Sequence, residues 1–320
     1  MPAGRAITAP AGAVLQPLRA VTAGVLEVAC YETGPAEGAP VILLHGFPYD
    51  VHSYVEVAPR LAARGCRVIV PYLRGYGPTR FLHADTPRSG EQAALGADLL
   101  ALMDGLELPR AVLAGYDWGG RAACVVAALW PARCAGLVSL NSYNIQDIAG
   151  AMRPDRPENE QRLWYQYYFH SERGRNALAA DRRALCRLLW RLWSPSWHFN
   201  DTVFARSAAA FDNPDFVEVV IHSYRHRFGL VAGDPAYADI ERRLAAQPAI
   251  RVPAITFDGA DDGVRPPAAA AQHARHFAGP REHRVVPGVG HNLPQEAPQA
   301  FVDAVLELVE RARADSSETP

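Results

Sequence analysis

A carboxylate that could act as a nucleophile lies in the turn Gly115-Tyr116-Asp117-Trp118-Gly119-Gly120. The apolar run Ala111–Ala114 precedes it, so the pattern predicts a sharp bend from a buried strand into a helix, with Asp117 at its apex. A carboxylate that attacks an ester merely exchanges the ester for an anhydride. Attack on a saturated carbon with a strained or good leaving group gives instead an aspartyl ester, which water can hydrolyse. The turn therefore favours an epoxide or an alkyl halide as substrate.

The elements that would position this turn are those of a parallel sheet, because short apolar runs alternate with helical patterns. Strands are predicted at Val41–Leu44, Arg67–Val70, Ala111–Ala114, Gly136–Leu140, Val252–Phe257 and His283–Val286. A capping box at 89–92 predicts the start of one helix. Phe301, Val305 and Leu308 share one face of a last helix that we expect to pack on the sheet. The first 24 residues are expected to be a loose leader, and the tail 313–320 to be frayed.

The alternation of strand and helix stops near Asn144 and resumes near Ile250. The intervening segment is rich in aromatic residues and arginine, and it contains four of the six tryptophans. A helical insertion after a sheet strand is expected to cover the carboxyl ends of the strands, where open α/β sheets bind ligands. We therefore predict a core domain formed by residues 1–143 and 236–320, and a helical cap domain formed by residues 144–235.

The composition excludes several classes of function. The chain of 320 residues has a net charge of −2, which leaves no basic footprint for nucleic acid. It contains no lysine, so Schiff-base chemistry and a Walker-type phosphate loop are excluded. No stretch approaches the roughly 20 apolar residues of a membrane span. We expect a cytoplasmic protein, with five buried free thiols in a reducing compartment: Cys30, Cys66, Cys124, Cys134 and Cys186.

Five motifs in sequence carry a family resemblance. They are His45-Gly46-Phe47-Pro48, Arg74-Gly75-Tyr76-Gly77, the turn around Asp117, Gly259-Ala260-Asp261-Asp262 and Gly290-His291. With them the chain resembles the α/β-hydrolase superfamily and, within it, the epoxide hydrolases, with the haloalkane and fluoroacetate dehalogenases as related families. The order of nucleophile, acid and histidine is that of the superfamily. The resemblance implies an α/β-hydrolase fold, with a mostly parallel sheet flanked by helices and an inserted helical cap.

The resemblance also implies a catalytic triad. Asp117 would form the covalent ester, and His291 would activate the water that hydrolyses it, since the unperturbed pKa of histidine lies near neutrality. A carboxylate must hold the second ring nitrogen of His291. The family pattern assigns this role to Asp262, with the adjacent Asp261 as the alternative. In some relatives the acid follows the preceding strand, where this chain has Asn141.

Epoxide opening requires a proton donor for the leaving oxygen. Epoxide hydrolases use two tyrosines of the cap, and the matching positions here are Tyr165 and Tyr224. A phenol suits this role, because it donates a hydrogen bond at neutral pH and tolerates a partly apolar pocket. Tyr167 and Tyr168 are the alternatives if the match is out of register.

The resemblance assigns the oxyanion hole to the backbone N–H groups of Phe47 and Trp118. The same two positions help to separate the families. Haloalkane dehalogenases hold the halide with the tryptophan after the nucleophile and with an asparagine or a second tryptophan; Trp118 fits, but Phe47 occupies the asparagine position. Fluoroacetate dehalogenases carry arginines one and four residues after the nucleophile, and a histidine where Tyr165 stands. Only Arg121 matches, and we interpret it as a salt-bridged helix arginine, while its binding of an anionic substrate group stays open.

The sequence thus favours an epoxide hydrolase that forms a vicinal diol, with a small apolar organic molecule and water as its partners. A dehalogenase that uses the same Asp117 and a non-catalytic ligand-binding protein are the alternatives. Two histidine pairs, His222 with His226 and His273 with His276, have helical spacing but no accompanying glutamate or cysteine. We interpret them as cap and surface histidines and expect neither a metal nor another cofactor. Whether the chain forms a homodimer stays open.

Overall fold

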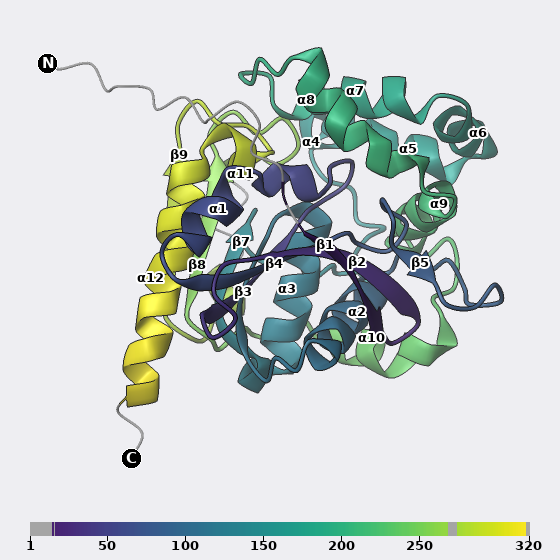
Figure 1. Cartoon of the computed structure of the whole chain (residues 1–320). Helices are drawn as coiled ribbons and strands as arrows, with labels where there is room; N and C mark the ends of the chain where they lie inside the picture. Colours follow the sequence, from purple (N-terminus) through teal and green to yellow (C-terminus); the bar gives the residue numbers. More distant parts are fainter. Residues whose placement is uncertain (1–14, 16, 268–273, 318–320) are drawn as a thin grey trace, which may run out of the picture.

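The computed structural model describes residue 15, residues 17–267 and residues 274–317 of the chain (Figure 1). Within them lies a nine-stranded sheet with the order β1-β2-β4-β3-β6-β7-β8-β9, in which β5 pairs with β2. The six strands that follow one another in the sheet as β4-β3-β6-β7-β8-β9 are parallel, whereas β1 and β2 are antiparallel to their neighbours. The bounds are β1 Leu18–Ala23, β2 Leu26–Thr33, β3 Ala39–Leu44, β4 Cys66–Pro71, β5 Arg80–Phe81, β6 Ala111–Gly115, β7 Cys134–Leu140, β8 Ala254–Gly259 and β9 Arg281–Val286.

Helices cover both faces of this sheet (Figure 1). The helices α1 (Val57–Ala62) and α12 (Pro298–Ser317) pack on one face, and α2 (Gln92–Gly105) and α3 (Asp117–Leu129) pack on the other. The helix α10 (Ala238–Ala245) lies against α2. Because both faces are covered, the central strands are apolar along most of their length, as is usual for parallel sheets. The α/β-hydrolase fold predicted from the sequence is therefore confirmed.

The remaining long helices occur between β7 and β8. They are α4 Pro157–Arg162, α5 Trp164–His170, α6 Glu172–Ala180, α7 Arg182–Trp193, α8 Asp201–Ala208 and α9 Phe216–His226. Figure 1 shows them gathered at one end of the sheet, in teal and green. Short helical turns complete the structure: η1 Val51–Tyr54, η2 Pro131–Arg133, η3 Ala209–Asp212, η4 Pro235–Tyr237 and α11 Leu293–Glu296.

The six predicted strands correspond to β3, β4, β6, β7, β8 and β9, with ends that differ by at most two residues. The prediction that the first 24 residues form a loose leader is wrong in part, because β1 occupies Leu18–Ala23 and pairs with β2. In β1 only Val21 and Ala23 are buried, so its apolar pattern is weak. Hydrogen bonds to β2, which the sequence pattern does not reveal, hold it in the sheet.

The predicted capping box does not form. The helix α2 begins at Gln92, with Glu91 as its N-cap residue, and the Ser89 hydroxyl donates to a Glu91 carboxylate oxygen over 2.9 Å. The backbone N–H of Ala93 donates instead to Oε1 of Glu241 in α10, over 3.1 Å. A carboxylate distant in the sequence therefore caps this helix, and it also complements the positive end of the helix dipole.

The C-terminal helix is longer than predicted. Phe301, Val305 and Leu308 are buried as expected, but α12 continues to Ser317 instead of fraying from residue 313. Residues 318–320 of the tail lie outside the described residues. All five cysteines are free and buried. Among the described helices, none is both long enough and apolar enough to cross a lipid bilayer.

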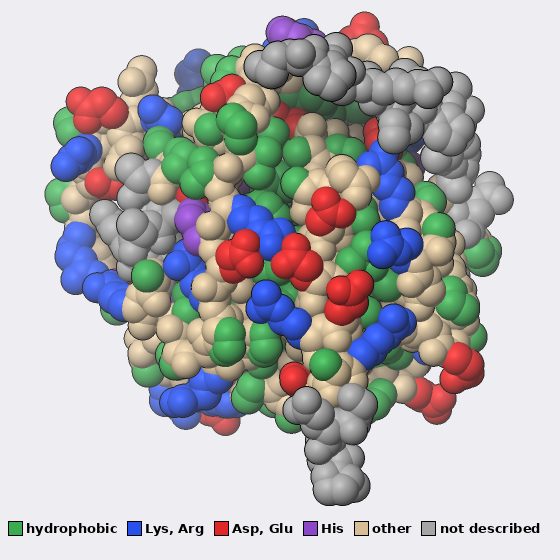
Figure 2. Space-filling model, turned by 90° about the vertical axis from the view of Figure 1, so that its left-hand side faces the viewer, with side chains coloured by type: hydrophobic (Ala, Val, Ile, Leu, Met, Phe, Trp, Pro, Cys, Tyr) green, Lys and Arg blue, Asp and Glu red, His purple; other side chains and the backbone are tan. Residues whose placement is uncertain are grey.

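The face that lies on the left of Figure 1 carries charges of both signs. Figure 2 shows basic and acidic side chains intermingled across it, with apolar side chains between them. One such contact joins the edge strand to the last helix: the Arg284 guanidinium donates to both carboxylate oxygens of Glu307, over 2.9 and 2.8 Å. This ion pair ties β9 to α12 at the end of the sheet.

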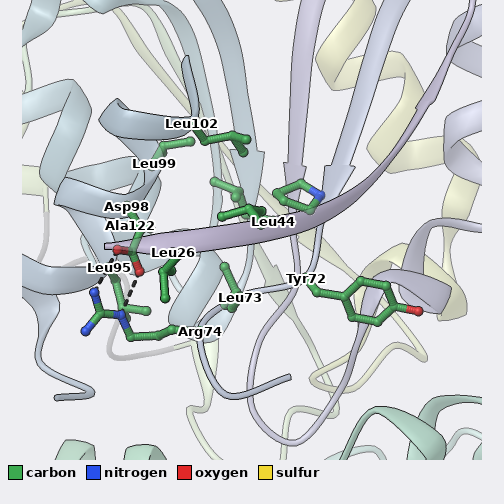
Figure 3. Close-up of a pocket in the computed structure, with 12 residues that line it drawn as sticks. Leu26, Leu44, Tyr72, Leu73, Arg74, Leu95, Asp98, Leu99, Leu102 and Ala122 are labelled. Carbon is green, nitrogen blue, oxygen red and sulfur yellow. Dashed lines mark hydrogen bonds and ion pairs between the residues drawn. The ribbon is translucent and has the colours of Figure 1, made fainter. Parts of the chain in front are cut away.

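A buried ion pair lies beneath β2, beside a small cavity of about 20 Å³ (Figure 3). Nε and Nη2 of Arg74 donate to the two carboxylate oxygens of Asp98 in α2, over 2.6 and 2.7 Å. Nη1 of Arg74 donates to the backbone carbonyl of Ser89 over 2.7 Å. The arginine of the Arg74-Gly75-Tyr76-Gly77 motif thus holds α2 against the sheet. This ion pair and apolar side chains from β2, β3, α2 and α3 line the cavity, whereas none of the predicted site residues does.

Removal of one partner of this pair should destabilise the fold strongly. We expect Asp98→Ala to lower the free energy of unfolding by about 3–5 kcal/mol, because Arg74 would stay buried without its counter-charge. The matched control is Asp104→Ala in the same helix. The Asp104 side chain is 67% exposed and pairs with Arg133, so its loss should cost about 1 kcal/mol or less. Urea denaturation followed by circular dichroism measures both values, and equal losses would contradict the prediction.

Candidate active site

Asp117 lies at the bend between β6 and α3, with a left-handed backbone (φ of 49°). Non-glycine residues rarely adopt this conformation, so the surrounding packing must hold it in place. The glycines of the turn allow that packing. A Cβ at Gly119 would lie 2.1 Å from the carbonyl oxygen of Leu44, and one at Gly115 would lie 2.7 Å from Gly119. The small residues of the motif therefore let α3 start directly against β3 and β6.

The other predicted site residues also follow the carboxyl ends of parallel strands, where such sheets bind ligands. Phe47 follows β3, Asp262 follows β8 and His291 follows β9. The backbone N–H of Phe47 donates to Oδ1 of Asp117 over 2.8 Å. A Cβ at Gly46 would lie 2.5 Å from the Asp117 Cβ, so only glycine lets this loop come so close. The structure thus places a backbone donor on the oxygen that would become the ester carbonyl.

The imidazole of His291 is hydrogen-bonded to the carboxylate of Asp262. Its Nδ1 lies 2.8 Å from Oδ2 of Asp262, and both residues are buried. Two backbone N–H groups of the following turn donate to Oδ1 of Asp262, and the Asn141 amide donates to Oδ2 over 3.0 Å. The alternative acid, Asp261, is exposed. Asn141, which occupies the acid position of some relatives, is here a donor that orients Asp262.

Nε2 of His291 points toward the nucleophile. It lies 3.9 Å from Oδ2 of Asp117, which is beyond hydrogen-bonding distance. Burial by itself would lower the pKa of His291, but the negative charges of Asp262 and Asp117 outweigh this effect and raise it to about 10. Burial likewise opposes ionisation of Asp117, yet His291, Arg121 and the Phe47 N–H hold the pKa of this carboxyl below its usual value. The free site therefore contains an ionised aspartate beside a protonated histidine.

A network that the sequence did not predict holds the histidine loop. The Ser194 hydroxyl, directly after α7, donates to Glu296 over 2.6 Å and accepts from the backbone N–H of His291 over 3.0 Å. Glu296 also accepts from the backbone N–H groups of Gly290 and Asn292, over 2.7 and 3.0 Å. These residues come from distant segments and belong to no short motif, so no local signal could have found them.

Tyr165 of α5 and Tyr224 of α9 lie together, with ring centroids 5.4 Å apart and ring planes at 83°. Both are buried. The Tyr165 hydroxyl accepts from the Gln166 amide over 3.0 Å, while that of Tyr224 makes no hydrogen bond to a described residue. Burial, together with the charge of Asp117, raises the pKa of each phenol, so both stay protonated donors at neutral pH. Tyr167 is exposed and Tyr168 is half-buried.

Aromatic rings enclose the space around the Asp117 turn. Phe47 stacks on Trp118 at 5.7 Å and contacts Tyr224 at 5.3 Å between ring centroids. Trp193, the last residue of α7, lies 6.1 Å from Phe47 and 5.3 Å from the imidazole of His291. The indole Nε1 atoms of Trp118 and Trp193 make no hydrogen bond to the described residues. The sequence placed Trp193 among the aromatic residues of the insertion, but gave no sign that it contacts the histidine.

Arg121 is not the salt-bridged helix arginine expected from the sequence. It is 5% exposed, and no described residue pairs with it as a salt bridge. Its Nε and Nη1 atoms have no hydrogen-bond partner among the described residues. Burial and the neighbouring charge of Arg227 lower the pKa of Arg121 to about 9, whereas Asp117 opposes this shift. A guanidinium thus lies buried one helical turn beyond the nucleophile.

His226, one of the histidines expected in the cap, is buried. His226, at the end of α9, is 8% exposed, and its ring stacks on that of the half-buried His222 at 5.6 Å. In the second pair, His276 stacks on Tyr143 at 4.2 Å. His273 lies outside the described residues. Of the three described histidines in these pairs, only His226 is buried.

Comparisons with known proteins agree with this geometry. The alpha/beta hydrolase fold family matches residues 39–298. Epoxide hydrolase B of Mycobacterium tuberculosis is 31% identical over 150 residues, a match that spans 43% of this chain and only 42% of that relative. Epoxide hydrolase A of the same organism is 27% identical over 301 residues, which cover 85% of this chain and 91% of the relative.

Comparison with solved structures also finds proteins of this fold. A candidate epoxide hydrolase from Klebsiella pneumoniae is 48% identical, with a TM-score of 0.90, and the match covers 92% of this chain and 97% of that one. A haloalkane dehalogenase variant from Bradyrhizobium elkanii has a TM-score of 0.76 over 95% of this chain and 99% of its own; at 22% identity it shows a common fold alone. With a family match over most of its length and the expected nucleophile turn, the chain belongs to the alpha/beta hydrolase fold family.

Proposed function

We propose that the protein is an epoxide hydrolase that opens an apolar epoxide to a vicinal diol through an ester on Asp117. The observation that carries this proposal is the pair of buried phenols, Tyr165 and Tyr224, beside a buried aspartate nucleophile. Esters of carboxylic acids need no such donors, whereas an epoxide oxygen must be protonated as its bond to carbon breaks. Two relatives from Mycobacterium tuberculosis are named epoxide hydrolases, which supports the same choice.

In the first step, Oδ2 of Asp117 attacks one carbon of the epoxide. Oδ1 already accepts from the Phe47 N–H, so Oδ2 is the freer oxygen. The new C–O bond forms as the strained C–O bond of the ring breaks, and the electron pair moves to the ring oxygen. A proton from Tyr165 or Tyr224 neutralises that oxygen, because an alkoxide is a far stronger base than a phenolate. The product of this step is a hydroxyalkyl ester on Asp117.

Ester formation itself switches His291 into a base. Before the reaction, the negative charge of Asp117 helps to raise the pKa of His291. The ester is neutral, so this contribution disappears and the pKa of His291 falls. The imidazolium then returns a proton to the phenolate left by the first step, and the neutral imidazole accepts a proton from water.

Hydroxide then attacks the ester carbon, and the oxyanion on Oδ1 is stabilised by the N–H groups of Phe47 and Trp118. The tetrahedral intermediate then collapses, the C–O bond to the substrate breaks, and the departing oxygen takes the proton of the new carboxyl group. This restores the Asp117 carboxylate, and Asp262 compensates the charge of the imidazolium while the diol leaves.

We further propose that residues 144–235 form a cap domain over a core made of residues 1–143 and 236–320. Both candidate proton donors belong to α5 and α9 of this segment. So does Trp193, which touches the histidine of the core. The aromatic lining that the segment brings to the site favours a substrate with an apolar aryl or alkyl group.

Isotope labelling tests the covalent mechanism. In a single turnover in water enriched in oxygen-18, with enzyme in excess over an aryl epoxide, we expect the label in the Asp117 carboxylate and not in the diol. The reason is that water attacks the ester carbon and the diol takes its new oxygen from the aspartate. Mass spectrometry of the peptide and the diol measures both. His291→Gln should trap the ester as an added mass on the protein. Label in the diol of the first turnover would disprove the covalent intermediate.

The proposed switch predicts a change in the pKa of His291. Asp117→Asn removes a negative charge whose oxygen lies 3.9 Å from Nε2, so the pKa should fall from the wild-type value by about 1 to 3 pH units. Proton NMR of the imidazole over a pH series measures it, with His291→Gln to assign the signal. The matched control is Asp261→Asn, which removes an exposed carboxylate and should change the pKa little. An equal effect of both variants would refute the switch.

A dehalogenase is the second candidate, because two indole N–H groups lack acceptors. Nε1 of Trp118 and Nε1 of Trp193 are both buried without a hydrogen-bond partner among the described residues. Two such donors beside a carboxylate nucleophile could hold a departing halide. Trp193 would then supply the second halide donor, which Phe47 cannot. The buried guanidinium of Arg121 adds a reason to include substrates that carry a carboxylate, as fluoroacetate does.

A panel of one aryl epoxide, one haloalkane and fluoroacetate separates these functions. We expect diol formation from the epoxide, and a loss of about 10²–10⁴-fold in kcat when both tyrosines are replaced by phenylalanine. Trp193→Phe keeps the ring and should leave this activity within a few-fold of wild type. Halide release that exceeds diol formation and is lost in Trp193→Phe would favour a dehalogenase. Fluoroacetate turnover that is lost in Arg121→Met would favour a haloacid dehalogenase. No turnover of any of the three would favour a ligand-binding protein.

A further inference from the structure

Three buried or half-buried ligand-type side chains meet outside the proposed active site, where α2, α9 and α10 come together. They are Glu91, His226 and Glu241, and one ligand atom from each lies within 4.8 Å of the others. Glu91 is the N-cap residue of α2, His226 is the last residue of α9, and Glu241 lies in the first turn of α10. The cluster therefore joins the end of the helical insertion to the helices that cover the sheet.

The Glu91 carboxylate is fixed by one oxygen and leaves the other unbonded. Oε1 accepts from the Ser89 hydroxyl and from the backbone N–H of Asp234, both over 2.9 Å. Oε2 is buried and makes no hydrogen bond to a described residue, although it lies 3.1 Å from Nε2 of His226. Glu91 is only 1% exposed, so bulk water does not compensate its charge. Its unbonded oxygen is held toward the imidazole.

Glu241 is oriented by donors of α2. Its Oε1 accepts from the backbone N–H of Ala93 and its Oε2 from the Gln92 amide, each over 3.1 Å. A carboxylate oxygen can accept more than one bond, so these contacts fix the group without exhausting its capacity. Metal-binding carboxylates are commonly held by hydrogen bonds of this kind.

Gly233 lies directly beside the cluster. A Cβ at this position would lie 1.9 Å from Oε2 of Glu91 and 2.9 Å from Nε2 of His226. Any other residue would press directly on the two atoms that face each other. Glycine therefore allows the backbone to pass this close to both atoms.

The residue types of the cluster favour a cation. Two carboxylates and one imidazole lie close together, and Glu91 is almost fully buried. Carboxylate oxygens and an imidazole nitrogen are common ligands of divalent metal ions.

We propose that Glu91, His226 and Glu241 bind a divalent metal ion, with Zn²⁺ as the preferred ion, and that this ion fastens the end of α9 to α2 and α10. Zn²⁺ accepts imidazole and carboxylate ligands at about 2.0–2.2 Å, and three protein ligands leave a position for water. Mg²⁺ and Ca²⁺ prefer oxygen ligands alone. Ligands of one tetrahedral ion lie roughly 3.4 Å apart, so the cluster needs to contract by only about 1 Å.

Metal titration of the tag-free, EDTA-treated and desalted protein tests this site without any assay of activity. By isothermal calorimetry with ZnCl₂ we expect one saturable site per chain, and weaker binding of MgCl₂. The melting temperature should rise with zinc concentration, because the ion binds only the folded state. Glu241→Gln, which removes a ligand charge, and Gly233→Ala, which fills the space at Glu91, should each weaken zinc binding by at least about tenfold.

Glu310→Gln in α12 is the matched control, because it removes an exposed carboxylate away from the cluster and should leave binding unchanged. Circular dichroism establishes that each variant is folded; if Glu241→Gln does not fold, His226→Gln takes its place. The proposal is overturned if the wild-type protein shows no saturable zinc binding, or if folded ligand variants bind zinc as tightly as Glu310→Gln does. Neither outcome bears on the aspartyl-ester mechanism, since no step of it uses these residues.

Discussion

The close approach of α3 to the ends of β3 and β6 is the constraint on which the site depends. A side chain at Gly119 would collide with the Leu44 carbonyl, and one at Gly46 would collide with Asp117. This approach holds Asp117 in its left-handed conformation and brings one carboxylate oxygen onto the Phe47 N–H. The nucleophile and the first half of its oxyanion hole are therefore products of the same backbone packing. The reactive side chain thus depends on a close backbone approach that only glycine allows.

Electrostatics connect the two proposed steps. Asp117 and Asp262 both face one imidazole, and together they keep His291 protonated while the nucleophile is ionised. Such a histidine is a poor base until one of the two charges is consumed. The proposed ester would remove the charge of Asp117, so the proposed order of the two steps follows from the arrangement of charges. Arg121, buried nearby without an ion-pair partner among the described residues, adds positive charge that acts on Asp117.

The helices between β7 and β8 bring side chains to the candidate site. Ser194, directly after α7, accepts a hydrogen bond from the backbone N–H of His291, while α5 and α9 carry the two phenols. The end of α9 also inserts His226 beside Glu91 at the start of α2. Besides other contacts, the insertion therefore meets the rest of the chain at the loop of His291 and at the N-terminus of α2. A movement of these helices would therefore displace residues in both of these regions.

The sequence alone determined the central strands, the nucleophile turn and the positions of the histidine and its acid, because each depends on spacing within a short segment. Only the tertiary structure decided that β1 joins the sheet, that Glu241 caps α2, that Asn141 orients Asp262, and that Arg121 has no salt bridge among the described residues. Each of these is a contact, or the lack of one, between residues far apart in the chain. Local periodicity carries no information about such pairs. One physical reason explains both what the sequence predicted and what it missed. A sequence pattern indicates which face of an element is buried, whereas folding decides which residues pack against that face.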